Sequence, residues 1–492
     1  GGGGGEGGLR AFILSLPLQF GVRFEWMEGV ARAMADKAAE MILRLLLHLL
    51  PPSSSVVDPP LLMMTALIVM QETSSPPSDD DLFALVDWSM QRLQQVTVAA
   101  VEKEDTVEDA ILLSSSSSIS ALSLLTVIGV ATARMKTRRA RGRTLVDALY
   151  HLLEWSACPV VVVAEAASRG IAEIAKFSSL SVSDLLVRNG TNVSNRVALS
   201  SRRYFSNRRC PLVLSSLLNR LESDDLFTHL SLIVEDLIGA LDRHNIDWCL
   251  LILRVIYAYA KTINRWYPEQ MPPLDPRKEF VVEEIVEEGE EEGEGDGEQE
   301  EKLVEETPKP IPQKSVKMAE WILKRTKHLH SSLHLPVCIL SLSIAGECIH
   351  HVRHWDDVLL PMVHQNWASL VPRFDDSNYE CRIAALRLLG RMAEVSGDFI
   401  HRKIRDELWP GIESWLRAEA SAEGGFELSR KLKYTVALLE RLPVIFDRCA
   451  LSVHLNASLA EICTQMSINK TQSNTVIEAA RRALVVLRTN EN

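Results

Sequence analysis

The chain has 492 residues and a mass of 55.0 kDa, and its composition of 47% hydrophobic, 24% charged and 6% aromatic residues excludes both a wholly disordered protein and a small disulfide-stabilised one. Its net charge of −12 comes from one segment, since twelve acidic residues and no basic one lie within Glu283 to Glu301. The remainder is neutral, so the charge indicates no global preference for cationic partners and does not exclude nucleic acid. Eight cysteines, none in a C-x-x-C pair, are typical of buried thiols in a reducing compartment.

The first residues carry little information about the fold. Residues 1–8 are glycine apart from Glu6, and we treat this low-complexity start separately from the folded chain. The apolar stretch Ala11 to Phe20 lacks a small-residue cleavage site and leads into a charged helical pattern. We therefore interpret it as mature chain and not as a signal peptide.

Residues 110–133 contain no charged residue, and the basic run Arg134 to Arg143 follows them, as expected of a membrane span with a positive flank. The serines of Ser114 to Ser118 make the stretch weakly apolar and favour a flexible insertion between buried helices. The basic run has no interleaved aromatic residue that could stack on bases, so we expect a solvated loop and no direct nucleic-acid binding. A membrane-tethered scaffold through residues 110–133 stays as an alternative.

Strand signals are weak in the next part of the chain. Val160 to Val163 is β-branched, and Asn189-Gly190 could close a hairpin. The neighbours of both fit helices better, and we expect Gly190 to be a helix C-cap. Helices are then predicted as a pair, Asp224 to Leu241 with Asp247 to Trp266.

An acidic block interrupts the helical pattern after this pair. Residues 271–315 combine a Glu/Gly core with Pro308, Pro310 and Pro312. A block with so many charges cannot bury enough apolar surface to offset the conformational entropy that it would lose on ordering. We therefore predict a disordered linker. Shorter low-complexity breaks lie at Pro51 to Pro60 and at Thr73 to Asp81.

The periodicity is clearest beyond the linker. A second pair is predicted from Val316 to Leu335 and from Pro336 to His354, where Pro336 suits a first helical turn. From Tyr379 onward, apolar residues recur at helical spacing and predict an amphipathic helix of about four turns. Two later patterns, Ile400 to Trp415 and Ile477 to Leu487, are spaced in the same way.

The helices also repeat as pairs. A helix predicted to begin at Leu360-Pro361 and to run through Trp367 has a counterpart that begins at Trp409-Pro410 and runs through Trp415. The offset is 49 residues between the two starts and 48 residues between Trp367 and Trp415. This is near the period of a two-helix HEAT unit.

The turn and second helix of the first unit show why these residue types fit. Asp375 to Asn378 can form a tight turn and cap the next helix. Arg382 is expected to reach a turn carboxylate of a neighbouring repeat, and the small Ala385 and Gly390 are expected to let helices approach closely.

These patterns predict an all-α fold, an α-solenoid of HEAT-like helical hairpins interrupted by the acidic linker. After the glycine start at 1–8, we expect an N-terminal HEAT-like region at 9–270 with Ser/Pro-rich insertions, the linker at 271–315, and a C-terminal HEAT-repeat region at 316–492.

No catalytic or metal-binding pattern stands out. Seven histidines and two cysteines crowd residues 328–364, but His334 and His350 lie about 15 residues apart on a predicted hairpin, too far apart to share one metal. The chain has no G-x-S-x-G elbow, no phosphate-binding loop and no H-E-x-x-H motif. We expect a non-enzymatic protein with no metal and no cofactor.

Two serines lie in acidic contexts that suit an acid-directed kinase. Ser78 precedes three aspartates, and Ser223 lies among Glu222, Asp224 and Asp225. The alternative for each is helix capping, which we favour for Ser223 and leave open for Ser78.

The stretches VLLPMVHQNWASLVPRF and VSGDFIHRKIRDELWPGIESWL resemble the C-terminal part of the Tel-two-interacting protein one family, from about Trp321 to Leu487. The resemblance implies a scaffold of the triple-T complex that holds the Tel-two and Tti-two subunits. That complex acts with the heat-shock-ninety chaperone and its R2TP-type adaptor in the maturation of phosphatidylinositol-3-kinase-related kinases of the mTOR, ATM and ATR type. The implied location is the cytoplasm, with the nucleus as a second compartment.

The resemblance and the aromatic anchors together give a set of expected partner-binding residues. The tryptophans recur at helical spacing, so the alternative to partner binding is that they pack in the core. The set is His364, Gln365, Trp367, Arg373, Asp398, Phe399 and Trp409. From the residues alone, a HEAT-repeat transport receptor or another protein-binding adaptor stays open.

Overall fold

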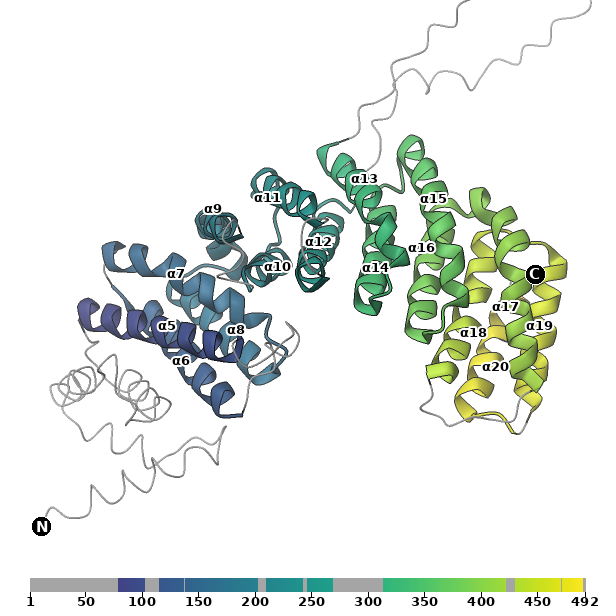
Figure 1. The fold of residues 1–492 in the computed structure, drawn as a ribbon, viewed down its shortest axis with the longest axis horizontal. Helices are drawn as coiled ribbons and strands as arrows, with labels where there is room; N and C mark the ends of the chain where they lie inside the picture. Colours follow the sequence, from purple (N-terminus) through teal and green to yellow (C-terminus); the bar gives the residue numbers. More distant parts are fainter. Residues whose placement is uncertain are drawn as a thin grey trace, which may run out of the picture. The chain divides into compact units, whose positions relative to one another are not determined.

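The computed structural model describes residues 78–101, 115–136, 138–201, 209–241, 246–268, 313–421, 430–469 and 471–489 (Figure 1). The glycine start, the break at Pro51 to Pro60 and the core of the acidic linker lie outside these ranges. Within them the chain forms helices joined by short turns and no strand, which confirms the all-α class and its repeated helical hairpins. Two compact units divide within one helix, at Thr262 and Ile263.

The first unit contains helices that pack mainly on near neighbours in the sequence. Helix α6 lies against α5 and α8, α7 packs on α8 and α10, and α10 also contacts α9. The bounds are α5 (Asp79–Val101), α6 (Ser115–Arg134), α7 (Arg138–Ser156), α8 (Val161–Phe177), α9 (Val182–Ser201), α10 (Cys210–Arg220), α11 (Phe227–Gly239) and α12 (Ile246–Trp266), whose last turn belongs to the second unit.

Helix α6 corrects two expectations for residues 110–133. Its serines 115–118 form the first turn of the helix and not a flexible insertion, and its apolar side chains are buried in the core of the unit. Among the described residues, no helix combines the length and the apolarity that a membrane crossing requires. The expected basic loop is also wrong in part, since Arg138–Ser156 is helix α7.

Two glycines set the distance between α6 and α8. A Cβ atom on Gly129 would lie 2.4 Å from the Cα of Gly170, closer than any side-chain carbon can approach a backbone. Gly190, by contrast, lies inside α9 and does not end a helix as expected. The β-branched run at Val161 begins α8, which confirms the helical interpretation.

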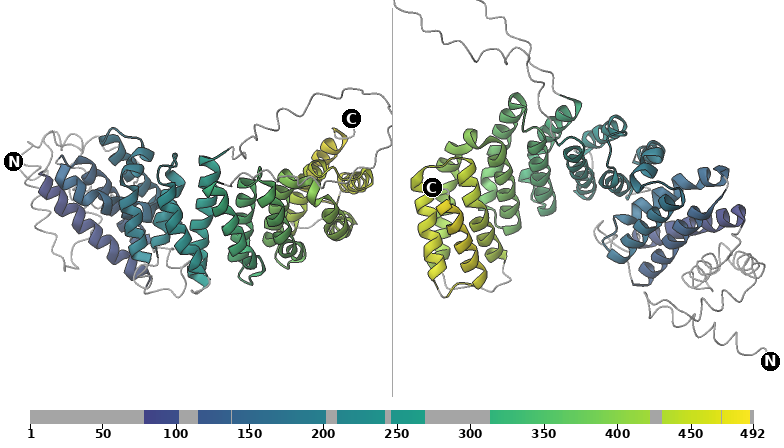
Figure 2. Two further views of the ribbon diagram at one scale, coloured as in Figure 1. Left: turned by 90° about the horizontal axis from the view of Figure 1, so that it is seen from above. Right: turned by 180° about the vertical axis from the view of Figure 1, so that it is seen from behind.

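The second unit consists of two rows of helices (Figure 2). Helices α14, α16, α18 and α20 pack in succession, while α13 contacts α15 and α17 contacts α19 on the other side of the hairpins. The bounds are α13 (Lys314–Thr326), η5 (Lys327–Ser331), α14 (Leu335–His351), α15 (Asp356–Leu370), η6 (Val371–Asp375), α16 (Tyr379–Lys403), η7 (Ile404–Leu408), α17 (Trp409–Ser421), α18 (Arg430–Arg448), α19 (Val453–Ile468) and α20 (Asn474–Thr489).

Several helix boundaries agree with the sequence. Pro336 lies in the first turn of α14, and the Asn378 side chain accepts a hydrogen bond of 2.9 Å from the backbone N–H of Glu380, which caps α16. Pro361, however, lies inside α15, which begins five residues earlier at Asp356. The expected start at Leu360-Pro361 is therefore wrong.

Helix α16 is longer than predicted and bends. It spans 25 residues, and Ser396 has non-helical angles of φ −147° and ψ 37°. Immediately after this bend, a Cβ atom on Gly397 would meet the carbonyl oxygen of Arg448 at 2.1 Å. Gly390 has only the Arg441 side chain near its Cβ position, so the close approach expected at Gly390 occurs at Gly397 instead.

Replacing Gly397 by alanine is expected to destabilise the protein by about 2 kcal/mol or more, because the new methyl group would force α16 away from the end of α18. Gly411→Ala is the matched control, since nothing lies within 4 Å of its Cβ position in α17. That variant should be about 0.5–1 kcal/mol more stable than the wild type. Urea unfolding measures both, and equal stability of the two variants would contradict the close approach.

Two fully buried histidines make the stability depend on pH. Burial lowers the pKa of both His330 and His351 to about 4. Their Nδ1 atoms lie 2.9 Å from Ser369 Oγ and 3.1 Å from Asn264 Oδ1. Both are neutral in the folded protein at pH 5, whereas the unfolded chain protonates them below about 6.5.

The free energy of unfolding should therefore fall as the pH decreases from about 6.5 towards 4, by about 2 kcal/mol for each histidine between pH 7 and pH 5. Urea unfolding at both pH values measures this loss. His330→Gln should reduce this loss, because the glutamine side chain does not titrate. An identical pH dependence in the wild type and His330→Gln would show that His330 does not contribute.

Candidate functional site

Residues of the resembling stretches converge on one lysine where α15, the second half of α16 and η7 meet. We call His364, Trp367, Phe399, Lys403 and Glu407 the Lys403 cluster. His364 and Trp367 are three residues apart on α15, while Phe399, Lys403 and Glu407 follow one another at intervals of four. Each group therefore lies on one side of its helical segment.

The ammonium group of Lys403 has three partners from this set. Its Nζ lies 3.0 Å from His364 Nδ1, 5.5 Å from the ring centroid of Trp367 and 5.8 Å from that of Phe399. A cation over aromatic faces is attracted by their negative charge density. Lys403 is half-buried and Phe399 is 38% exposed, so an apolar ring reaches the surface beside the partly accessible cation.

Trp367 is the buried member of the cluster. It is only 3% exposed, and its indole Nε1 donates a hydrogen bond of 2.7 Å to Glu407 Oε2. Glu407 lies in η7, a short π-helical segment in which the backbone N–H of Trp409 bonds to the carbonyl of Ile404 five residues earlier. π-helical turns inside α-helices are frequent at functional sites.

A pocket of about 310 Å³ adjoins the cluster and shares Glu407 with it. Within it, the Arg382 guanidinium lies over Trp415 and Tyr434, at 5.0 and 5.6 Å from their ring centroids. The lining comes from η6, α16, η7, α17 and α18: Val371, Phe374, Asp375, Arg382, Glu407, Leu408, Gly411, Ile412, Ser414, Trp415, Ala418 and Tyr434. Rings, one guanidinium and two carboxylates suit the side chains of a bound peptide or protein.

Arg382 differs from its predicted role. Its Nε donates to the backbone oxygen of Asp376 in the turn before its own helix, and its guanidinium lies on aromatic rings. It does not pair with the carboxylate of a neighbouring repeat as expected. Burial of the Tyr434 ring beneath it raises the pKa of that phenol, so the phenol stays protonated at neutral pH.

The other expected partner-binding residues lie in different environments. Gln365 and Asp398 are exposed, on α15 and α16. Trp409 is 3% exposed and packs edge-on against Phe446 with ring centroids 5.0 Å apart, so it belongs to the core. Arg373 is half-buried and pairs with Asp376 at 3.0 Å, outside the Lys403 cluster.

The two serines behave differently from each other. Ser78 Oγ accepts the backbone N–H of Asp81 at 3.2 Å and donates to its carboxylate at 2.6 Å, so it caps α5. Ser223 donates to Asp225 at 2.6 Å, but α11 begins only at Phe227. The cap predicted at Ser223 is therefore wrong.

The histidine-rich part of the chain does not gather into a metal site. In the described ranges, no three His, Cys, Asp or Glu side chains are grouped so that they could hold a metal ion. His351, which the sequence places near Cys348 and His354, instead faces Asn264 of α12.

Lys403 and Glu407 were not among the residues expected from the sequence. The spacing of Phe399, Lys403 and Glu407 on one helical side was a usable signal. The approach of these side chains to α15 could not be predicted from the sequence, because it depends on the bend at Ser396.

Comparison with known families agrees with the resemblance seen in the sequence. The family model described as "TTI1 C-terminal TPR domain" matches residues 260–491, and the one described as "TELO2-interacting protein 1" matches residues 149–238. The chain belongs to the TELO2-interacting protein 1 family. The Lys403 cluster and the pocket lie inside the larger matched range.

Two curated relatives carry the name "TELO2-interacting protein 1 homolog". The mouse protein is 23% identical over 384 residues and the human protein 22% over 388 residues, in each case covering 70% of this chain and 35% of the relative. The chain thus spans about a third of the length of these relatives.

Two solved structures are similar at a TM-score of 0.39. One is an engineered protein, 14% identical, with 94% of this chain and 93% of that protein covered. The other is importin beta in an ammonium sulfate condition, 11% identical, with 94% and 58% covered.

The hydrogen bond from Trp367 to Glu407 can be tested by removing only the donor. Trp367→Phe should cost about 1.5–3 kcal/mol more than Trp355→Phe, because a hydrogen bond to a charged acceptor is lost. Trp355 is a matched control, since it is also buried and its Nε1 has no hydrogen-bond partner in the described part of the chain. Urea unfolding measures both, and equal losses would show that the bond contributes nothing.

Proposed function

We propose that the chain is a non-enzymatic scaffold that binds TELO2, as a subunit of the triple-T complex, through the Lys403 cluster and the adjoining pocket. The observation that supports this most directly is the family match over residues 260–491, a range that includes all of these side chains. The relatives are named for their interaction with TELO2.

The surface has the properties of a protein-binding hot spot. Phe399 offers an exposed ring beside a cation, and the neighbouring pocket is large enough for one or two side chains. Buried Trp367 fixes the position of Glu407 at the border between cluster and pocket. Stacked helical hairpins provide a long surface for large partners, and this favours binding over catalysis.

For the wider role we extend the proposal to what the family resemblance implies. We propose that the complex contains Tti-two, works with heat-shock-ninety and its R2TP-type adaptor, and supports the maturation of phosphatidylinositol-3-kinase-related kinases in the cytoplasm and nucleus. Residues 271–315 are proposed to act as the linker between the N-terminal helical region, 9–270, and the C-terminal one, 316–492. Gln365 and Asp398 are proposed as additional contacts at the edge of the cluster.

A binding experiment tests the surface directly. Purified full-length chain and the TELO2 homologue of the same cells are titrated by isothermal calorimetry, using wild type, Phe399→Ala and Lys403→Glu. We expect each variant to bind about tenfold more weakly, since truncating a hot-spot residue costs more than 1 kcal/mol. Phe177→Ala in α8 is the control, because it removes a phenylalanine of the first unit that is even more exposed, at 51% against 38% for Phe399.

The possible outcomes distinguish an error in the location of the binding site from an error in the proposed function. Unchanged affinity of both cluster variants, with tight wild-type binding, would place the TELO2 site elsewhere on the chain. No wild-type binding, together with recovery of importin-type cargo when the tagged chain is purified from its cells, would favour the transport-receptor alternative.

A further inference from the structure

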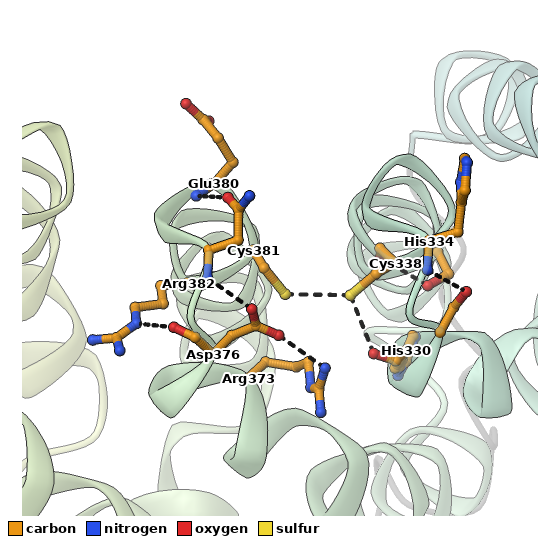
Figure 3. A network of polar contacts seen from close by, with 11 residues as sticks. His330, His334, Cys338, Arg373, Asp376, Glu380, Cys381 and Arg382 are labelled. Atoms are coloured by element: carbon orange, nitrogen blue, oxygen red, sulfur yellow. Dashed lines mark hydrogen bonds and ion pairs between the residues drawn. The ribbon is translucent and has the colours of Figure 1, made fainter. Parts of the chain in front are cut away.

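Two cysteines from neighbouring helices lie in direct contact inside the second unit. The Sγ atoms of Cys338 in α14 and Cys381 in α16 are 3.3 Å apart, and each residue is 1% exposed (Figure 3). Both lie in the first turn of their helix. All eight cysteines of the chain are reduced and buried, so these two thiols are a pair and not a disulfide.

The sulfur of Cys338 has two close partners, since it donates to the backbone oxygen of His330 at 3.1 Å and lies 3.3 Å from Cys381 Sγ. Figure 3 shows Arg373 and Asp376 on one side of the two sulfurs and His330 on the other. Arg373 Nη1 pairs with Asp376 at 3.0 Å, while its buried Nε has no hydrogen-bond partner in the described part of the chain. A positive group beside a thiol at a helix N-terminus stabilises the deprotonated form.

The pKa directions agree with this geometry. The hydrogen bond from Cys381 lowers the pKa of Cys338, and Arg373 adds to this effect. Together they outweigh burial and the Asp376 carboxylate, which both raise this pKa. Burial has the opposite effect on other cysteines, raising the pKa of Cys210, Cys449 and Cys463 to about 12. The thiolate that reacts with oxidants is therefore favoured at Cys338 and suppressed at those three positions.

We propose that Cys338 and Cys381 form an oxidation site, at which hydrogen peroxide converts the two thiols into a disulfide that joins α14 to α16. The Cys338 thiolate attacks one peroxide oxygen, breaks the O–O bond and becomes a sulfenic acid, and the released hydroxide takes up a proton to form water. The Cys381 sulfur then attacks the sulfenic sulfur. The S–S bond forms, the S–O bond breaks, and a second water leaves with the Cys381 proton.

Neither step requires a large rearrangement. A disulfide bond is about 2.05 Å long, so the sulfurs must approach by little more than 1 Å from their 3.3 Å separation. Their burial limits access to a small oxidant such as a peroxide. The cross-link would also lie beside the turn that follows α15, where Val371, Phe374 and Asp375 line the pocket.

Peptide mapping tests the proposal on the full chain. The reduced protein is treated with hydrogen peroxide, alkylated in denaturant and digested, and a sample treated with dithiothreitol after oxidation is processed in parallel. We expect a linked Cys338–Cys381 peptide in the oxidised sample alone, with the other six cysteines alkylated. The oxidised protein should melt at a higher temperature than the reduced one, because the bond restricts the unfolded chain.

Variants distinguish this pair from general oxidation. Cys338→Ser and Cys381→Ser should each abolish the linked peptide and the change in melting temperature, whereas Cys463→Ser should preserve both. Arg373→Gln should move the pH profile of the oxidation rate to higher pH, and Arg373→Lys should restore it. Complete alkylation of both thiols after exposure to peroxide that fully oxidises glutathione would overturn the proposal, as would a disulfide from Cys338 to any other cysteine.

Discussion

The close approach of Gly397 to the backbone of Arg448 is the constraint on which the candidate site depends. Only a residue without a side chain fits there, and the bend at Ser396 immediately precedes it. The Ser396 hydroxyl donates to the carbonyl of Met392 at 2.8 Å, a side-chain bond of the kind that bends helices. The bend gives the second half of α16 the direction that brings Phe399 and Lys403 to α15.

Local signals in the sequence were sufficient for most of the fold. Helical periodicity predicted several helices of the second unit but neither α18 nor α19, and the Asn378 cap and Pro336 marked two helix starts correctly. Each of these depends on residues a few positions apart. Single glycines and prolines were less informative, because Gly190 and Pro361 lie inside helices whose tertiary packing outweighs their local preference.

The candidate site was only partly predictable for the same reason. His364, Trp367 and Phe399 stood out through a family resemblance, but the lysine that they share did not. Periodicity also cannot distinguish a tryptophan that packs in the core from a phenylalanine at the surface, as Trp409 and Phe399 show. Which small residue meets a backbone, Gly390 or Gly397, depends on a helix about fifty residues away.

The π-helical turn η7 determines where the run from α16 to α17 can lose a residue. Helices α16 and α17 are continuous through η7, and a π turn is equivalent to one residue inserted into an α-helix. The wider turn accommodates the extra residue, so the side chains before and after η7 keep their helical faces, and Leu408 and Trp409 lie in the core. Deleting one residue of η7 would convert it into a regular α-helical turn without moving these faces, whereas the same deletion inside α17 would rotate every later side chain of that helix by about 100°.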